Sequence, residues 1–268
     1  ASQLFSALTP TTVQVGSLET AECIKLVDNS YRDLTFAFGN EVARLCNAIG
    51  INAKEVIDRG KLGYARTNVA SPGPVGGPCL SKDPHILAES AKLYGISLDL
   101  VPAARKVNER QPAEIAMFLK NQFRDQAALP SNAKVSLLGL AFKGNPPNAD
   151  LRGTMATPML EQLRYHFQDS LFFGFDAVVA LQEIKEFGLN PACDVESAFD
   201  GASIVIILND HKVFQDMDID RLSKKMMPDS IIFDCWNLFE PSDLILRKDV
   251  NYHSIGAGHL VQSLEEHG

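Results

Sequence analysis

The sequence lacks the short motifs and long apolar runs that would assign it to a familiar functional class. It contains neither a GxGxxG dinucleotide fingerprint nor a GxxxxGK[ST] phosphate loop. It has no run of about 18 apolar residues, so we expect no membrane span. The first residues lack the basic region and apolar core of a signal peptide. We therefore expect neither a membrane protein nor a secreted one.

Cysteines are few, and they are widely separated along the sequence. The five cysteines include no CxxC pair, which argues against a zinc site or a redox dithiol. An odd, scattered set suits a reducing compartment better than a disulfide framework does. The sequence thus predicts a cytoplasmic protein without a bound metal. The cysteines are Cys23, Cys46, Cys79, Cys193 and Cys235.

Positive charge is also in short supply. There are 25 Lys and Arg against 33 Asp and Glu, which gives a formal net charge of −8. This balance argues against nucleic acid or an anionic membrane as a partner, although a local basic pocket for a phosphate remains compatible with it. With 46% hydrophobic residues and 268 residues in all, the chain is long enough for two globular domains.

The first half of the chain is predicted to be helical. Apolar residues recur at helical spacing over 17–49, and Gly50 follows as a stop signal. Asn52 with Glu55 three residues later is typical of a helix cap. Further helices are expected over 83–93 and over 99–125, the latter bent at Pro112, with a Gly- and Pro-rich loop over 60–82.

The second half alternates short apolar runs with amphipathic stretches. This alternation predicts a parallel, doubly wound α/β domain. The apolar runs cover 135–140, 171–175, 204–208 and 231–233. The amphipathic stretches cover 156–167, 178–187 and 217–226.

Cys79 lies in a glycine-rich loop just before a predicted helix start. Glycines let a backbone approach a ligand closely, and helix amides with Lys82 nearby favour a thiolate over a thiol that ordinarily titrates near ~8.5. Asp83, the predicted N-cap, could orient or deprotonate a water. On residue types alone, a turn with a buried cysteine and a capping aspartate is the better interpretation.

Two further groups could carry chemistry. Lys25 and Asn29 share one helix face with Glu22, and together they could donate hydrogen bonds to an oxyanion. Alone, they are better explained as a solvated polar stripe. The stretch Gly139–Lys143, followed by Asp150–Arg152, ends the first predicted strand, where ligands of open α/β sheets bind. Its cations suit a phosphate or nucleotide, or are simply solvated.

Taken in order, these three motifs resemble those of the UDP-glucose/GDP-mannose dehydrogenase family. The family's AE, K and N pattern on a long helix matches Ala21–Asn29. Its GxGG-x-C loop with a following acid matches Gly76–Asp83, although Pro74 stands where the first glycine is usual. Its strand-end GLAFK and DxR match Gly139–Lys143 and Asp150–Arg152. Three ordered motifs over nearly the whole chain outweigh the separate alternatives.

The resemblance implies an architecture and an activity. The family oxidises C6 of a nucleotide sugar to a carboxylate with two NAD⁺, an activity that also implies polysaccharide biosynthesis. Residues 1–12 would be a linker from an absent NAD-binding domain, so NAD would belong to a full-length parent and its binding residues stay unassigned. Residues 13–128 would form an all-helical dimerisation domain with the catalytic cysteine. Residues 129–268 would form a Rossmann-like UDP-sugar-binding domain.

The resemblance also implies roles for individual residues. Cys79 would be the nucleophile that captures a C6 aldehyde, Lys25 and Asn29 would stabilise the oxyanion, and Asp83 would assist with water. The fragment alone is expected to be inactive and to form a homodimer. The substrate-binding residues implied are Gly76, Gly77, Lys82, Phe142, Lys143, Arg152 and Arg66.

Departures from the family pattern leave the sugar open. Trp236 stands where the family usually has the Arg of a DxRN pattern, which puts one anionic contact in doubt. Asn108 and His211 lean toward the N-acetylhexosamine branch, whereas Lys82 with Asp83 leans toward the glucose branch. A non-catalytic nucleotide-sugar-binding and dimerisation module is the alternative function. Retention of Cys79, Lys25, Asn29 and Asp83 together favours the enzyme, because a binding module needs no nucleophile.

Overall fold

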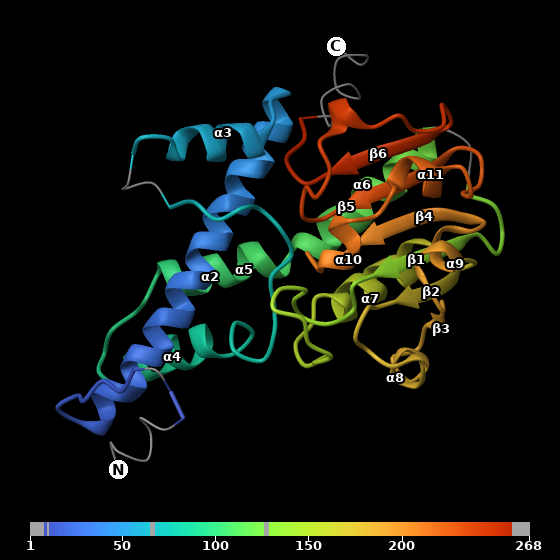
Figure 1. The fold of residues 1–268 in the computed structure, drawn as a ribbon. Helices are drawn as coiled ribbons and strands as arrows, with labels where there is room; N and C mark the ends of the chain where they lie inside the picture. The colour runs from blue at the N-terminus through green and yellow to red at the C-terminus, as the bar shows by residue number, and fades with distance from the viewer. Residues whose placement is uncertain (1–7, 10, 65–67, 126–128, 259–268) are drawn as a thin grey trace.

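A computed structural model describes residues 8, 9, 11–64, 68–125 and 129–258. In Figure 1 the chain passes from a group of helices into a sheet flanked by helices. The two parts lie side by side, and the loop between α3 and α4 runs toward the sheet (Figure 1). This order of helices and then an α/β unit is the one the sequence predicts.

The long helix α2, Leu18–Ile49, is the axis of the first part. Ser17 caps it by accepting a hydrogen bond from the Thr20 amide, and Gly50 ends it at a φ of 73°. The short helix α3, Ala53–Lys61, begins at the Asn52 cap, as predicted. Two further helices, α4 (Asp83–Lys92) and α5 (Leu100–Glu109), pack against α2.

The helix predicted over 99–125 is two helices. After α5, Arg110 forms a C-cap, and α6 covers Gln111–Asp125. Pro112 therefore lies in the first turn of α6, where the amide that proline lacks has no partner within the helix. The apolar residues of α6, including Ile115 and Leu119, join the core of the sheet. The prediction of one bent helix was wrong because proline began a helix instead of bending one.

Six parallel strands form one sheet in the order β3-β2-β1-β4-β5-β6. This is the strand order of a doubly wound dinucleotide-type fold, which reverses direction between β1 and β4. The α/β prediction is confirmed. The strands are β1 (Lys134–Leu138), β2 (Leu171–Phe175), β3 (Asn190–Pro191), β4 (Ala202–Ile207), β5 (Ser230–Asp234) and β6 (Val250–Ser254).

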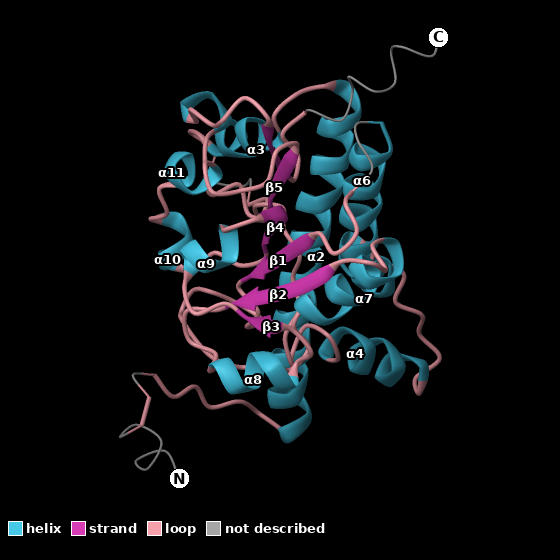
Figure 2. Ribbon diagram, turned by 90° about the vertical axis from the view of Figure 1, so that its right-hand side faces the viewer, coloured by secondary structure: helices cyan, strands magenta, loops and turns pink. Residues whose placement is uncertain are grey.

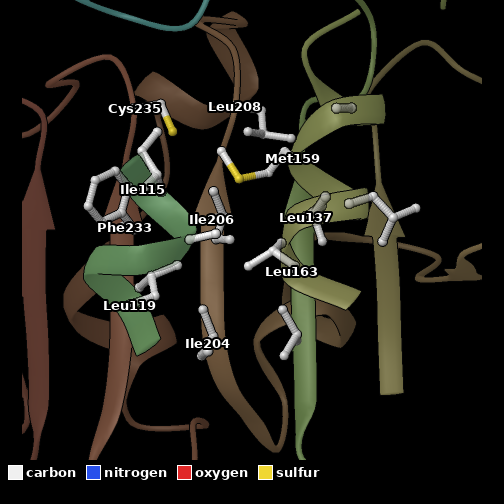
Figure 3. Packing of buried hydrophobic residues seen from close by; sticks show 14 of the residues in the cluster. Ile115, Leu119, Leu137, Met159, Leu163, Ile204, Ile206, Leu208, Phe233 and Cys235 are labelled. Carbon is white, nitrogen blue, oxygen red and sulfur yellow. The ribbon is translucent and has the colours of Figure 1, made fainter. Parts of the chain in front are cut away.

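Helices cover both faces of the sheet (Figure 2). Alternate strand residues point to opposite faces, so Ile206 packs with α6 and α7, whereas Val205 and Ile207 pack with the helices of the other face. Figure 3 shows the first of these clusters, with Met159 and Leu163 between β4 and β1. The helices between strands are α7 (Ala156–His166), α8 (Leu181–Glu186), α9 (Val195–Phe199), α10 (Lys212–Gln215) and α11 (Ile219–Ser223), and a short 3-10 turn, η1, covers Pro241–Asp243.

Candidate active site

The loop before α4 runs along one face of α2. Its polar attachment is Asn40, whose side chain accepts from the Gly73 amide at 2.8 Å and donates to the Gly73 carbonyl at 3.1 Å. The backbones of the loop and of α2 approach closely at Gly39, where a Cβ would collide with the carbonyl oxygen of Ala70. These contacts fix the loop on α2 at Gly39 and Asn40, and Cys79 then meets the amino-terminal half of that helix at Lys25.

Cys79 faces a lysine of α2. The Lys25 ammonium donates to the Cys79 sulfur at 3.8 Å, so two motifs far apart in the sequence meet. The amides of Lys82 and Asp83 donate to the Cys79 carbonyl at 3.2 and 2.8 Å, which closes a turn into α4. Cys79 is half-buried, whereas Cys46 and Cys235 are buried and Cys23 and Cys193 are exposed.

Asp83 is the most enclosed carboxylate beside Cys79, with a side chain only 1% exposed. Asn29 donates to it at 2.6 Å and Lys82 at 2.7 Å. Lys25 lies 3.4 Å from it. Burial raises the pKa of Asp83, but the hydrogen bonds from two lysines and Asn29 outweigh burial and hold that pKa below its usual value. The carboxylate is thus kept ionised between cations.

Asp83 does not cap α4. The N-cap is Lys82, without a side-chain cap, and Asp83 is the first residue of the helix. The predicted cap was wrong because the carboxylate turns toward Asn29 and the two lysines instead of the helix amides. The pKa of Lys82 is raised by its hydrogen bond to Asp83. Lys82 is thereby engaged with Asp83, although its side chain remains 58% exposed.

The Gly139–Lys143 stretch leaves β1 at the carboxyl edge of the sheet, beside β4. Gly139 has a φ of +85°, and a Cβ there would lie 2.6 Å from the Asn209 side chain, which follows β4. The Asp176 carboxylate accepts from the amides of Leu140 and Ala141 at 2.7 and 3.0 Å. The stretch is therefore fixed at the point where the strand order reverses, which is where ligands of such sheets bind.

The cysteine loop touches this edge directly. The Gly77 amide donates to the Gly153 carbonyl at 2.6 Å. Gly77 has a φ of +96°, and a Cβ added to it would lie 2.5 Å from the ring of Phe142. A Cβ on Gly76 would collide with the carbonyl oxygen of Gly153. Gly76 is needed for the close approach of the Gly153 backbone, and Gly77 for its positive φ and the close approach of the Phe142 ring, so all three sequence motifs converge on one place.

Two cations face this junction. Arg152 forms an ion pair with Asp150 at 2.7 Å and is 78% exposed. Hydrogen bonds and attraction from Asp150 raise the pKa of Arg152. The Lys143 ammonium lies 5.4 Å from the centroid of the Phe142 ring. Arg66 lies outside the described residues.

Of the residues around the cysteine loop, the sequence marks Trp236 and Asn108 only as features of the family pattern, and it does not mark Asp33 or Arg105. Trp236 places its ring 3.1 Å from the position of a Cβ on Gly73 and donates to the Leu208 carbonyl at 2.7 Å. It therefore packs on the cysteine loop. Asp33, Arg105 and Asn108 form a buried polar cluster behind the loop. Their separation in sequence hid them, but Asp33 does continue the four-residue spacing from Lys25 and Asn29.

Other possible sites lie apart from this cluster. A cavity of about 340 Å³ lies between α2, α6 and the sheet, and its lining includes Asn47, Phe118 and Ile255 but none of the residues predicted for the site. Within the described residues, no group of three or more His, Cys, Asp or Glu is placed to hold a metal. No helix in the same part of the chain is long and apolar enough to cross a membrane.

Two family models match the chain. The central domain of the UDP-glucose/GDP-mannose dehydrogenase family matches residues 19–110, and the UDP binding domain of that family matches residues 136–241. The first model contains Lys25, Cys79 and Asp83, and the second contains Lys143 and Arg152. The junction between the cysteine loop and the sheet edge therefore joins the two matched domains.

Individual relatives agree with the family models. A UDP-N-acetyl-D-mannosamine dehydrogenase of Pyrococcus horikoshii is 30% identical over 87% of this chain and 52% of its own length. An NDP-N-acetyl-D-galactosaminuronic acid dehydrogenase of Ralstonia solanacearum is 31% identical over 81% of this chain and 48% of its own length. The chain thus spans about half the length of these relatives.

A solved structure matches the fold over the same extent. It is an NDP-N-acetyl-D-galactosaminuronic acid dehydrogenase of Methanosarcina mazei, which superposes with a TM-score of 0.78 at 28% identity. The superposition covers 91% of this chain and 52% of the solved chain. The helical part and the sheet therefore occur together in a known arrangement.

Proposed function

Because this chain belongs to the UDP-glucose/GDP-mannose dehydrogenase family, we propose that it is the substrate-binding and catalytic-cysteine portion of an NAD-dependent UDP-sugar 6-dehydrogenase. The observation that carries this proposal is the contact of Cys79 with Lys25, 3.8 Å apart, directly beside the carboxyl edge of the sheet. The proposed nucleophile and a cation then lie together, and the loop that carries them contacts the sheet edge that bears Lys143 and Arg152. A non-catalytic binding module would need only the basic edge.

Cys79 would act on an aldehyde at C6. Its thiolate adds to the aldehyde carbon to give a thiohemiacetal, and the carbonyl oxygen becomes an oxyanion. Lys25 and Asn29 are the donors that would stabilise this charge. Covalent capture holds the aldehyde until its second oxidation to a thioester, and water then releases the acid and restores the thiol.

Asp83 would orient the cations and the hydrolytic water. Its three hydrogen-bonding or ionic partners and its lowered pKa make it a weak base near neutral pH. Orientation of water is therefore better supported than removal of its proton. The same carboxylate keeps Lys25 and Asn29 on the side of Cys79, so that both donors act on one oxygen.

NAD would supply the hydride acceptor, but the described residues do not fit its dinucleotide. In a dinucleotide-binding turn the first strand leads into a helix within a few glycines. Here residues 139–155 separate β1 from α7, and Phe142 and Thr154 fill the space beside the strand end, where Thr154 donates to the Leu140 carbonyl. We therefore assign NAD to residues beyond this chain, in a full-length parent, and derive no hydride step from the residues described.

A UDP-N-acetylhexosamine is the substrate that we favour. The relatives described above act, by name, on N-acetylated nucleotide sugars. Lys143 and Arg152 would contact the diphosphate, because both stand at the sheet edge and an arginine binds such groups through two parallel hydrogen bonds. Gly76 and Gly77 would let the sugar reach Cys79. UDP-glucose is the alternative substrate.

We also propose a cytoplasmic homodimer joined through α2. All five cysteines are free thiols, which suits a reducing compartment. Helix α2 exposes a row of large apolar residues that nothing in this chain covers among the described residues. A second copy could bury that row. The row consists of Ile24, Val27, Tyr31, Phe38, Leu45 and Ile49.

Calorimetry with UDP- and GDP-linked sugars tests the proposal on the 268-residue chain. We expect a UDP-N-acetylhexosamine to bind, Arg152→Gln and Lys143→Gln each to weaken it by about tenfold or more, and Cys79→Ser to leave it nearly unchanged. Lys54→Gln, an exposed lysine on α3, is the control. Absence of binding by every nucleotide sugar would contradict the proposal, and NADH production by this chain alone would contradict the assignment of NAD elsewhere.

A further inference from the structure

A buried arginine holds the segment that carries Cys79. The Arg105 side chain, on α5, is only 2% exposed. Its Nη1 donates to the Leu80 carbonyl at 3.0 Å, and its Nη2 donates to the Val75 carbonyl at 3.2 Å. These carbonyls flank Cys79 in the chain, and the Leu80 carbonyl belongs to the very next residue. One planar guanidinium therefore holds both ends of the segment that contains the nucleophile.

The same guanidinium is fixed from the α2 side. Asp33, itself 1% exposed, lies 2.5 Å from Arg105 Nη1. Asn108, one helical turn after Arg105, donates to the same carboxylate oxygen at 2.8 Å and to the Asp33 carbonyl at 2.9 Å. Asp33 lies one turn along α2 from Asn29 and two turns from Lys25. The face of α2 that presents Lys25 to Cys79 thus also sets the position of Arg105.

A buried ion pair is an expensive way to fill space. Removing two charges from water costs several kcal/mol, and well-packed apolar residues of similar volume are often as stable. What an arginine provides, and an apolar residue does not, is a rigid fork that fixes several oxygens in one plane. Here the fork joins one carboxylate of α2 to two carbonyls of the cysteine loop, which is a geometric task.

We propose that Arg105 is a positioning residue for Cys79: by tying the Val75 and Leu80 carbonyls to Asp33 of α2, it holds the cysteine sulfur beside the Lys25 ammonium. It acts through the loop backbone and not on substrate. The inference rests on the proposed function, because it takes Cys79 as the nucleophile. It adds a residue that none of the three motifs contains.

Native alkylation of the 268-residue chain with iodoacetamide at pH 7, resolved by cysteine with mass spectrometry, tests this role. A cation beside a thiol favours the reactive thiolate, so Cys79 should react faster than the exposed Cys193. In Arg105→Lys, which keeps the charge but loses the fork, we expect the Cys79 rate to fall by about tenfold. The rate at Cys193 should stay within about twofold, as an internal reference.

Two control variants separate positioning from stability. Ile206→Ala weakens the sheet core without touching the loop, and it should lower the melting temperature while leaving the Cys79 rate unchanged. Arg110→Lys makes the same substitution at the end of α5, where the arginine pairs with Glu114 and does not reach the loop carbonyls in the contacts described. It too should leave the rate unchanged.

The outcomes are distinct for the two claims. If Cys79 in the unmodified chain reacts no faster than Cys193, and Lys25→Gln leaves its rate unchanged, the proposed nucleophile is wrong and the inference fails with it. If Cys79 is fast and Arg105→Lys lowers the melting temperature while the Cys79 rate stays within about twofold, Arg105 only stabilises the fold. Should Arg105→Lys not fold, Asp33→Asn takes its place, because it removes the charge that orients the guanidinium. A fall of about tenfold in the Cys79 rate would then support positioning, and a rate within about twofold would contradict it.

Discussion

β4 and α2 run through the middle of the two halves of the molecule, yet they bury opposite kinds of side chain. Every residue of β4 is buried, and four of the six are Ile or Val. The buried residues of α2 are small or polar, and they include Asp33 and Asn40. Several large apolar residues of α2 are exposed, and two of them, Tyr31 and Phe38, are more than half exposed. The central strand is covered on both faces by apolar packing, whereas α2 buries its small and polar side chains and exposes apolar ones.

The difference follows from what each element has to hold. A central parallel strand must be covered on both faces, so a continuous apolar run is the stable sequence for it. Helix α2 instead supports a loop of backbone carbonyls and a thiol, which need hydrogen-bond donors and charges. Its apolar side is left for contact outside this chain. The largest buried apolar side chains are thus concentrated in the sheet and its flanking helices, and the proposed chemistry lies along α2.

The largest effect that we expect on the α2 side is the loss of turnover when the Cys79 thiol is removed. In the full-length enzyme of which this chain is the proposed part, Cys79→Ser should lower turnover by several orders of magnitude, because a hydroxyl is a far weaker nucleophile toward the aldehyde. Substrate binding should remain largely intact, since serine keeps the size and polarity of the position. Steady-state turnover with calorimetry measures both quantities.

Loss of any other cysteine should leave turnover largely intact. Cys46 and Cys235 are buried and Cys23 and Cys193 are exposed, and none of these four contacts Lys25 in the described contacts. Cys193→Ser is therefore the matched control. Near-normal acid production by the Cys79→Ser enzyme would show that the nucleophile is elsewhere and that the loop is only a turn.

A truncation in the sheet should cost stability without altering the chemistry. Ile206 is fully buried between β1, β5 and the helices of its face (Figure 3), and Ile206→Ala should reduce the free energy of unfolding by about 2–5 kcal/mol. Ile24 on α2 is 47% exposed, and Ile24→Ala should cost only about 0.5 kcal/mol or less in the monomer. Urea unfolding at concentrations where sedimentation shows monomer compares the two, and equal losses would contradict the contrast.

The sequence predicted the central strands of the sheet better than the edge strands, because burial decides how plain the apolar pattern is. The apolar runs predicted β1, β2, β4 and β5, because burial on both faces leaves a plain signal. It missed β3, which is only two exposed residues, and β6, whose middle residues are half-exposed, because strands at an edge need no apolar run. In β6, Asn251 and Tyr252 stand opposite Ile231 and Ile232 of β5.

The site divides in the same manner. Lys25, Asn29, Cys79 and Asp83 were predicted because they sit in short motifs, and the structure places them side by side. Arg105 was missed because arginines are almost never fully buried, so nothing local marks one as a core residue. Its partners, Asp33, Val75 and Leu80, lie far from it in the sequence, and only the folded structure shows that they all accept hydrogen bonds from one guanidinium.

The exposed row on α2 can be tested separately from folding. Phe38 is 56% exposed near the middle of the row, and Phe38→Asp should weaken the proposed homodimer by at least about tenfold, because a charge placed in an apolar interface loses its hydration. The free energy of unfolding of the monomer should change little. Ile245→Asp, at an 80% exposed position on the sheet side, is the control. A monomer at tens of micromolar in the unmodified chain would contradict the dimer itself.

The smallest predicted effect compares two carboxylates that lie on either side of the junction. For Asp150 a single partner dominates: hydrogen bonds from Arg152 lower its pKa to about 2. Asp83 has its pKa lowered against the opposing effect of burial, by partners that do not include Arg152. Arg152→Gln should therefore raise the titration midpoint of Asp150 toward its ordinary value, about 3.9, and leave that of Asp83 in place. Carboxyl carbon NMR during an acid titration measures both midpoints.

The sign of the pH effect follows from the direction of the shift. Because the folded-state pKa of Asp150 is depressed, its pair with Arg152 contributes its full stability above the unfolded value of about 3.9 and loses it as the pH falls through about 2. Arg152→Gln should lack that contribution near neutral pH. The slope of the free energy of unfolding against pH should therefore differ between the variant and the unmodified chain only between these two values. Arg152 is 78% exposed and Asp150 is only partly buried, so screening by water keeps the effect of the pair small. If Asp150 titrates at the same midpoint with and without Arg152, the two side chains are apart in solution, and Arg152 is already free to meet a diphosphate without first leaving a carboxylate.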